Sequence, residues 1–193
     1  MDLLIASNNL GKIAEFKAML SDKYKNIYGL KEYGIVCDIE ETGQSFEENA
    51  KIKATFIKNL LGIKQIDILA DDSGLCVDAL NGAPSIYSAR FSGIDATDKQ
   101  NRDKLLNCLN GIANRKAYFE AYLVLIKANG QIITANGRAY GEITTEEIGE
   151  FGFGYDSIFY SYELNATFAS ANIAQKDKIS HRAKALINLL NIL

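Results

Sequence analysis

The fold class is decided by D-L-L-I-A-S-N-N-L-G-K, residues 2–12. Residues 2–6, almost all apolar, have the length and composition of a buried strand. Helical spacing begins at once after them, because Ile13, Phe16 and Leu20 recur on one face of the segment from Asn9 to Leu20. A strand that leads directly into a helix indicates an α/β protein.

Working outward, the same alternation continues along the chain. Extended segments are expected at Ile35–Ile39, Ile66–Ala70 and Leu75–Val77, and a helix over Asp98–Leu109. Another helix should begin at Ser45, since Glu48 three residues later completes a capping-box pattern, and Gly62 should end it.

The last third of the chain adds a hairpin and a terminal helix. Tyr118–Lys127 and Gln131–Tyr140 are β-rich runs that meet around Asn129-Gly130, a favoured hairpin turn. Helical spacing in the C-terminal helix joins Ile179, Ala183, Leu186, Leu190 and Leu193. The hairpin requires an antiparallel pair, so we expect a mixed sheet, in a single domain over residues 1–193 with no separable second domain.

Composition excludes several function classes. The chain has 193 residues, 48% of them hydrophobic, which is enough for a sizeable core. A net charge of −3 provides no positive field for polymeric nucleic acid. No apolar run approaches the roughly 20 residues of a membrane-spanning helix. The start lacks signal-peptide features and the three cysteines form no C-x-x-C pair, so a cytoplasmic protein is the expectation.

A possible phosphate site lies where the first strand meets the first helix. Backbone amides at a helix start are unpaired, and the helix dipole favours anions there. Ser7, Asn9 and Lys12 add a hydroxyl, an amide and an ammonium. The pattern G-x-x-x-x-G-K-[ST] is absent, and Ser and Asn also cap helices for structural reasons, so both interpretations stay open from these residues alone.

Two acidic pairs form a second constellation. Glu40-Glu41 and Asp71-Asp72 each follow a predicted strand and precede a glycine by two residues. Side chains alternate along a strand, so one carboxylate of each pair can point into a cleft and share a magnesium ion. The alternative is that acidic residues before glycine form solvated turns.

Aromatic and basic residues form two further constellations. Glycines in Phe151–Asp156 allow a ligand to approach the backbone, and Phe153 or Tyr155 offers a ring on which a base can stack. His181 and Arg182 lie off the apolar stripe of the last helix, where their donors would be free. Against this, aromatic residues and a lone histidine more often belong to a core.

Six motifs together are highly specific. They are S-x-N-x-x-K at 7–12, E-E-T-G-x-S-F-x-E-N-A-x-x-K-A at 40–54, A-D-D-S-G-L-x-V-D at 70–78, G-A-P-x-I-Y-S-A-R-F-S-G at 82–93, G-F-G-Y-D at 152–156 and I-S-H-R-x-x-A-L at 179–186. In this order, and over nearly the whole chain, they closely resemble the inosine/xanthosine triphosphate pyrophosphatase family. Its members hydrolyse deaminated purine nucleoside triphosphates, including the deoxy forms, to the monophosphate and pyrophosphate.

The resemblance implies roles for particular residues. Asp72 is the implied proton acceptor and, with Glu40, the implied ligand of Mg²⁺. The implied substrate-binding residues are Ser7, Asn8, Asn9, Leu10, Gly11, Lys12, Ser73, Phe153, Gly154, Tyr155, Asp156, Lys176, His181 and Arg182. Lys53 is a further candidate for phosphate contact, because it lies one helical turn after Asn49 on the same face.

The resemblance also implies an elongated mixed β-sheet flanked by helices, in two lobes with a substrate cleft between them. It implies a homodimer, for which Gly82–Gly93 is the candidate contact region. Three positions depart from the family pattern: Ser7 for a frequent threonine, Ser157 for a usual proline, and Ala169-Ser170-Ala171 for Ala-Glu-Leu or Ala-Glu-Met. None removes a group assigned to the chemistry.

Two other functions remain open. One is a related nucleotide pyrophosphatase that acts on a different modified base. The other is a nucleotide-binding sensor without turnover. The presence of both Glu40 and Asp72 favours an enzyme, because lysines and backbone amides alone would suffice to bind phosphate.

Overall fold

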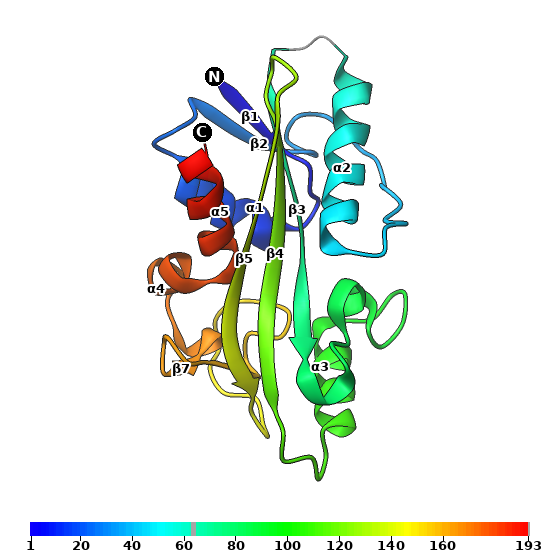
Figure 1. Ribbon diagram of the computed structural model, residues 1–193, viewed down its shortest axis with the longest axis vertical. Helices are drawn as coiled ribbons and strands as arrows, with labels where there is room; N and C mark the ends of the chain where they lie inside the picture. The colour runs from blue at the N-terminus through cyan, green and yellow to red at the C-terminus, as the bar shows by residue number, and fades with distance from the viewer. Residues whose placement is uncertain (63–64, 193) are drawn as a thin grey trace. The chain divides into compact units, whose positions relative to one another are not determined.

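Strands and helices alternate as the opening residues predict (Figure 1). The computed structural model describes residues 1–62 and 65–192. The strands are β1 (Asp2–Ile5), β2 (Asn26–Gly29), β3 (Asp67–Val77), β4 (Lys116–Ile126), β5 (Ile132–Ile143), β6 (Phe159–Ser161) and β7 (Ala166–Thr167). The α-helices are α1 (Leu10–Leu20), α2 (Phe46–Leu61), α3 (Asp98–Cys108), α4 (Ile173–Ile179) and α5 (His181–Ile192). Within these described ranges, no helix is long and apolar enough to cross a membrane.

The strands form a mixed sheet in the order β2-β1-β3-β4-β5-β6-β7. β1 pairs in parallel with β2 and β3, whereas β6 pairs antiparallel with β5 and β7. The predicted hairpin turn joins β4 to β5, and the Gly130 amide closes it by donating to the Lys127 carbonyl at 2.9 Å. These observations confirm the α/β class and the mixed sheet.

Contacts divide the chain into two compact units. Unit 1 comprises Met1–Asp72, Ala121–Asn136 and Ala185–Leu193, and unit 2 comprises Ser73–Glu120 and Gly137–Lys184. The chain therefore passes from unit 1 to unit 2 within β3, between two residues of the predicted site. The assignment of a single domain stays a prediction.

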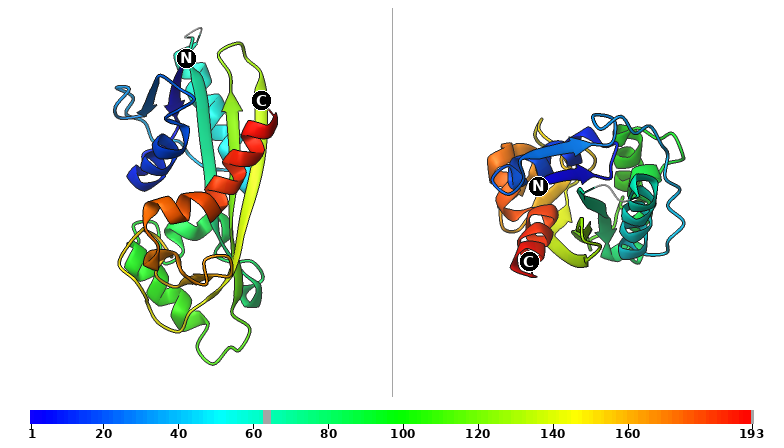
Figure 2. Two further views of the ribbon diagram at one scale, coloured as in Figure 1. Left: turned by 90° about the vertical axis from the view of Figure 1, so that its left-hand side faces the viewer. Right: turned by 90° about the horizontal axis from the view of Figure 1, so that it is seen from above.

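Unit 1 has a core on each face of its strands. Leu3 of β1 packs with Phe16 of α1 and Leu186 of α5. The next residue, Leu4, points the other way and packs with Ile57 of α2. In Figures 1 and 2, α2 accordingly covers one face of these strands, and α1 and α5 cover the other. Each such fully buried side chain contributes about 1.5–3 kcal/mol.

Unit 2 has an aromatic core. The ring centroids of Phe119 and Phe159 lie 4.7 Å apart and those of Phe159 and Phe168 lie 5.0 Å apart. Leu75 of β3 and Leu105 of α3 complete the same cluster. Edge-to-face and tilted aromatic pairs contribute about 0.5–1.5 kcal/mol beyond the free energy gained by burying their surface. This core supports the loop that carries the glycine-aromatic motif.

The predicted extended segment Ile35–Ile39 forms no strand. The parallel edge beside β1 is occupied by β2 instead. Ile35, Cys37 and Ile39 nevertheless pack on the core beneath α2. Their alternating pattern is therefore satisfied by side-chain packing without a ladder of backbone hydrogen bonds.

The predicted C-terminal helix is two helices. Ser180 has extended backbone (ψ 159°), which ends α4, and its Oγ accepts from the Ala183 amide at 3.1 Å at the start of α5. Ile179 consequently packs in the core of unit 2, whereas Leu186 packs in a core of unit 1. The last residue of the predicted stripe, Leu193, lies outside the described residues.

Candidate functional site

The loop between β1 and α1 is ordered by its own polar side chains. Ser7 Oγ accepts from the Asn9 amide at 3.1 Å, and Asn9 Oδ1 accepts from the Lys12 amide at 3.1 Å. Asn9 is thus the N-cap of α1. Asn8 donates to the Cys37 carbonyl at 3.2 Å. Asn8, Asn9 and Leu10 are exposed, so the start of this helix faces solvent.

Asp72 lies buried beneath α2. Asn49 Nδ2 donates to its Oδ2 at 3.0 Å, and Lys53 Nζ lies 3.6 Å from its Oδ1. The same Lys53 Nζ lies 3.0 Å from Glu41 Oε1. The i, i+4 spacing of Asn49 and Lys53 brings both side chains to one carboxylate. This is the helix face on which the sequence placed Lys53.

Burial and neighbouring charges shift the pKa values of Asp72 and Lys53 in opposite directions. Burial raises the pKa of Asp72 above its usual value, and the nearby Lys53 and Lys12 offset that rise only in part. For Lys53, burial alone would lower the pKa, but Asp72 and Glu41 outweigh it and the pKa is raised. The carboxylate is therefore more basic than an exposed aspartate, while the ammonium is held in its charged form.

The pair Asp71-Asp72 lies in the middle of β3, not at a strand end as predicted. Successive residues of a strand point to opposite faces. Asp71 accordingly meets α1, where Lys12 Nζ lies 2.6 Å from its Oδ2, whereas Asp72 meets α2. The interpretation as a solvated turn is wrong for this pair, because both carboxylates are buried.

The two carboxylates of the pair Glu40-Glu41 lie in different environments. Glu40 is exposed, and its neighbour Glu41 is the carboxylate that approaches Lys53. Gly43 allows this loop to lie against α2, because a Cβ there would come 2.9 Å from the Asn49 backbone nitrogen. Within residues 1–62 and 65–192, no three His, Cys, Asp or Glu side chains gather as a metal-binding group.

In unit 2, a buried ion pair organises the glycine-aromatic loop. Lys176 Nζ lies 2.6 Å from Asp156 Oδ2, which also accepts from the Phe153 amide at 2.9 Å. Two cations lie close to the Phe153 ring, with Lys176 Nζ 4.9 Å and Arg182 Cζ 5.3 Å from its centroid. Arg182 also donates to Ser73 Oγ at 3.1 Å. A half-buried ring flanked by cations is a suitable platform for a planar, electron-rich ligand.

Glycine is required at position 152 of this loop. Its φ is +80°, and a Cβ would come 2.1 Å from Asp156 Oδ2. Asp156 can accept from the Phe153 amide only because that space is empty. This explains the first glycine of G-F-G-Y-D.

Two predicted site side chains have buried partners within unit 2. Tyr155 is buried in the core of unit 2, and its hydroxyl donates to the Ser88 carbonyl at 2.8 Å, so the idea that its ring stacks on a base is wrong. His181 stacks on Phe119 with centroids 4.7 Å apart. His181 and Arg182 are 2% and 4% exposed, because Ser180 breaks the helix and turns both inward. The sequence placed both side chains off the apolar stripe of the last helix, and the structure buries them both.

Each unit thus gathers one set of predicted residues. Unit 1 holds the α1 start with Lys12, and Lys53 with Asp72, while unit 2 gathers Ser73, Phe153, Asp156, Lys176 and Arg182. Sequence reasoning missed Asn49 and Glu41 as partners of Asp72 and Lys53. The signal for Asn49 was present, since it lies four residues before Lys53.

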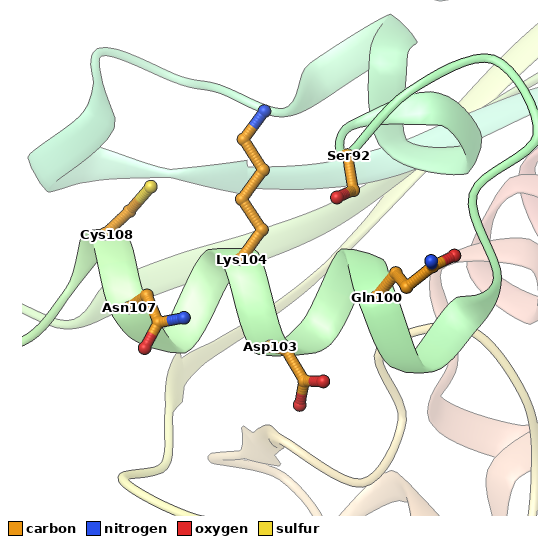
Figure 3. A pocket seen from close by; sticks show the side chains of 6 residues that line it. All are labelled: Ser92, Gln100, Asp103, Lys104, Asn107 and Cys108. Atoms are coloured by element: carbon orange, nitrogen blue, oxygen red, sulfur yellow. The ribbon is translucent and has the colours of Figure 1, made fainter.

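A separate hollow lies beside α3. It has a volume of about 540 Å³ and is lined by Ser92, Gln100, Asp103, Lys104, Asn107 and Cys108. Figure 3 shows Lys104 and Cys108 on the side of the helix that faces Ser92. None of the predicted site residues lines it.

Comparisons with known proteins agree with the motifs. The model of the Ham1 family matches residues 3–192. A dITP/XTP pyrophosphatase of Desulfotalea psychrophila is 44% identical over 187 residues, 97% of this chain and 82% of that protein. One of Staphylococcus epidermidis is 44% identical over 188 residues, 97% of this chain and 94% of that protein. The structure of the Staphylococcus aureus Ham1 protein has a TM-score of 0.85 and 43% identity, with 100% of this chain and 97% of that chain covered.

These matches confirm the resemblance that the six motifs indicate, and they confirm the fold class. They extend over almost the entire chain and include both units. The chain belongs to the Ham1 family.

Proposed function

We propose that this protein hydrolyses deaminated purine nucleoside triphosphates (ITP, dITP and XTP) to the nucleoside monophosphate and pyrophosphate. The observation that carries the proposal is the buried Asp72, placed by Asn49 and Lys53 in the unit that also holds the α1 start and Lys12. This set combines a base with cationic groups suited to phosphate. The names of the relatives, dITP/XTP pyrophosphatase, support the choice of substrate.

The phosphate chemistry follows from charge. Attack on a phosphorus that carries anionic oxygens requires those charges to be offset. Lys12, Lys53 and the amides at the start of α1 supply positive charge and donors for the triphosphate. Asp72, with its raised pKa, accepts the proton of the attacking water. Attack at the α-phosphorus breaks its bond to the oxygen that leaves with pyrophosphate.

Magnesium is part of this proposal. Mg²⁺ takes few protein carboxylates and completes its octahedron with water and phosphate oxygens. One buried carboxylate with an acidic pair nearby fits that need, so Asp72 and Glu40 would hold the ion, with Glu41 as the alternative from the same pair. When bound, the ion would offset charge on the phosphate oxygens.

The nucleoside is assigned to unit 2. Phe153 offers the only ring of the G-F-G-Y-D loop that is not buried in the core, and Lys176 and Arg182 flank it. Backbone groups from Phe153 to Asp156, with Ser73 and His181, complete the proposed binding set.

One assay tests the proposal against both alternatives. Pyrophosphate release is measured with ITP, dITP, XTP, GTP and ATP, with and without magnesium. We expect magnesium-dependent release of pyrophosphate and monophosphate from ITP, dITP and XTP, with GTP and ATP far slower. A preference for another base would indicate a related pyrophosphatase, and binding without turnover would indicate a sensor. Orthophosphate as the main product would exclude the proposed bond cleavage.

Arg182 and Lys12 should differ in how they affect base choice. Hypoxanthine and xanthine carry an oxygen at position six, where adenine carries an amino donor, so a donor such as Arg182 is matched only by the oxo bases. A buried unmatched donor costs roughly 1–3 kcal/mol, or about ten- to a hundredfold in discrimination. Arg182→Ala should therefore narrow the ITP-to-ATP ratio of kcat/KM, whereas Lys12→Ala should weaken both substrates alike.

Both variants are measured on both nucleotides. An unchanged ITP-to-ATP ratio in Arg182→Ala would assign base reading to the backbone from Phe153 to Asp156. Guanine keeps the oxygen at position six, so its exclusion must come from the amino group at position two.

We further propose a cytoplasmic homodimer. All three cysteines are free thiols, as is usual in a reducing compartment. The Gly82–Gly93 segment remains the candidate contact region, and Tyr87 within it is 55% exposed with Arg90 5.2 Å above its ring. Exposed tyrosine and arginine side chains are enriched in protein interfaces.

A further inference from the structure

Two side chains of α3 hold one residue of the glycine-aromatic loop at both of its backbone groups. Asp98 Oδ2 accepts from the Gly154 amide at 2.8 Å. Arg102 Nη1 donates to the Gly154 carbonyl at 2.8 Å. Asp98 and Arg102 are four residues apart and so lie on one face of the helix. Neither belongs to the motifs that carry the resemblance.

The helix start favours the charge of Asp98, and an ion pair holds the side chain of Arg102. Asp98 is the first residue of α3, where the helix dipole favours an acidic group and Thr97 caps the helix. Arg102 Nε lies 3.0 Å from Glu147 Oε2, which also accepts from Ser157 Oγ at 3.0 Å. Arg102 is thus linked through Glu147 to Ser157, which follows the glycine-aromatic loop.

Gly154 lies between the residue that supplies the half-buried ring and the residue that anchors the loop in the core. Phe153 precedes Gly154, and Tyr155 follows it with its side chain anchored in the core. A glycine at φ +61° has wide conformational freedom, so its backbone geometry must be set from outside. Charge-assisted hydrogen bonds at both its donor and its acceptor supply that constraint.

We propose that Asp98 and Arg102 are positioning residues for nucleobase recognition. By holding Gly154 from both sides, they fix the backbone that presents the Phe153 ring and the neighbouring amides to the base. They act through the loop and contact no reacting atom, so their loss should raise KM and relax base choice with little effect on kcat. The proposal rests on the nucleoside triphosphatase function proposed above.

The test uses Asp98→Ala and Arg102→Ala in the full-length protein. For each we expect KM for ITP to rise about tenfold, kcat to change less than about threefold, and the ITP-to-ATP ratio of kcat/KM to fall. Asp98→Asn should stay close to wild type, because its amide oxygen still accepts from the Gly154 amide. Lys99→Ala is the matched control, since this residue lies on the same helix in an exposed ion pair with Asp103. It should change nothing.

A second measurement does not depend on turnover. Hydrogen exchange of the amides at 151–157 should become faster in both alanine variants and remain unchanged in Lys99→Ala. Unchanged exchange, or faster exchange with unchanged KM and base ratio in folded variants, would overturn the proposal. If the wild-type protein fails to hydrolyse ITP, the proposed function is wrong. The positioning role is then tested by calorimetry of IMP binding, and we expect both alanine variants to bind IMP more weakly than the wild-type protein.

Discussion

Asp72→Asn is expected to lower kcat for ITP by at least about a hundredfold while the protein stays folded. The substitution removes a general base and a metal-binding charge in one step. The side chain keeps its shape, so an amide oxygen can still accept from Asn49 Nδ2. Lys53 retains Glu41 at 3.0 Å, so no buried ammonium is left without a counterion. The measurement is kcat at saturating magnesium, with the unfolding free energy measured alongside.

Asp71→Asn is the matched comparison. The two carboxylates are adjacent in β3 and both are buried, but Asp71 pairs with Lys12 on the opposite face. Its loss should act mainly on KM, because it removes the carboxylate that holds the Lys12 ammonium in place. Near-normal turnover in Asp72→Asn together with an inactive Asp71→Asn would transfer the role of base to Asp71.

The fold was predictable where one periodicity dominates a segment. The strand–helix start, α2, α3 and the hairpin all follow from local patterns. Predictions failed where one sequence pattern is compatible with two local structures. The alternating apolar residues Ile35, Cys37 and Ile39 suit a strand or a loop packed on the core equally well. The break at Ser180 was hidden because Ile179 and Leu186 have helical spacing but pack in different cores.

The sequence predicted which residues belong to the candidate site better than it predicted which side chains they contact. Sequence alone placed Lys53 on the helix face of Asn49, as a candidate for phosphate contact. That its ammonium lies near Asp72 depends on strand register, and β3 runs straight through Asp71 and Asp72. Nor could composition show that Tyr155 is committed to the core while Phe153 is not. The choice depends on which side chain the loop turns inward, and contacts distant in sequence such as that with Ser88 determine it.

Lys176→Met should be the most destabilising single substitution in the loop region of unit 2. Its Nζ lies 2.6 Å from Asp156 Oδ2, and the two side chains are only 7% and 5% exposed. Removing one partner of a buried ion pair leaves an uncompensated charge and costs about 3–5 kcal/mol. Methionine keeps most of the volume, so cavity formation contributes little. The free energy of unfolding in urea measures the loss.

A double variant separates charge from packing. Asp156→Asn combined with Lys176→Met removes both charges, and the asparagine oxygen can still accept from the Phe153 amide, so most of the lost stability should return. Lys184→Met is the control, because Lys184 pairs with Glu163 across a similar sequence distance but at the surface, where an ion pair contributes at most about 1 kcal/mol. If the double variant is as unstable as Lys176→Met, the penalty comes from the lost cation–π contacts of the ammonium with Phe153 and Phe168, over whose rings its Nζ lies at 4.9 and 5.7 Å.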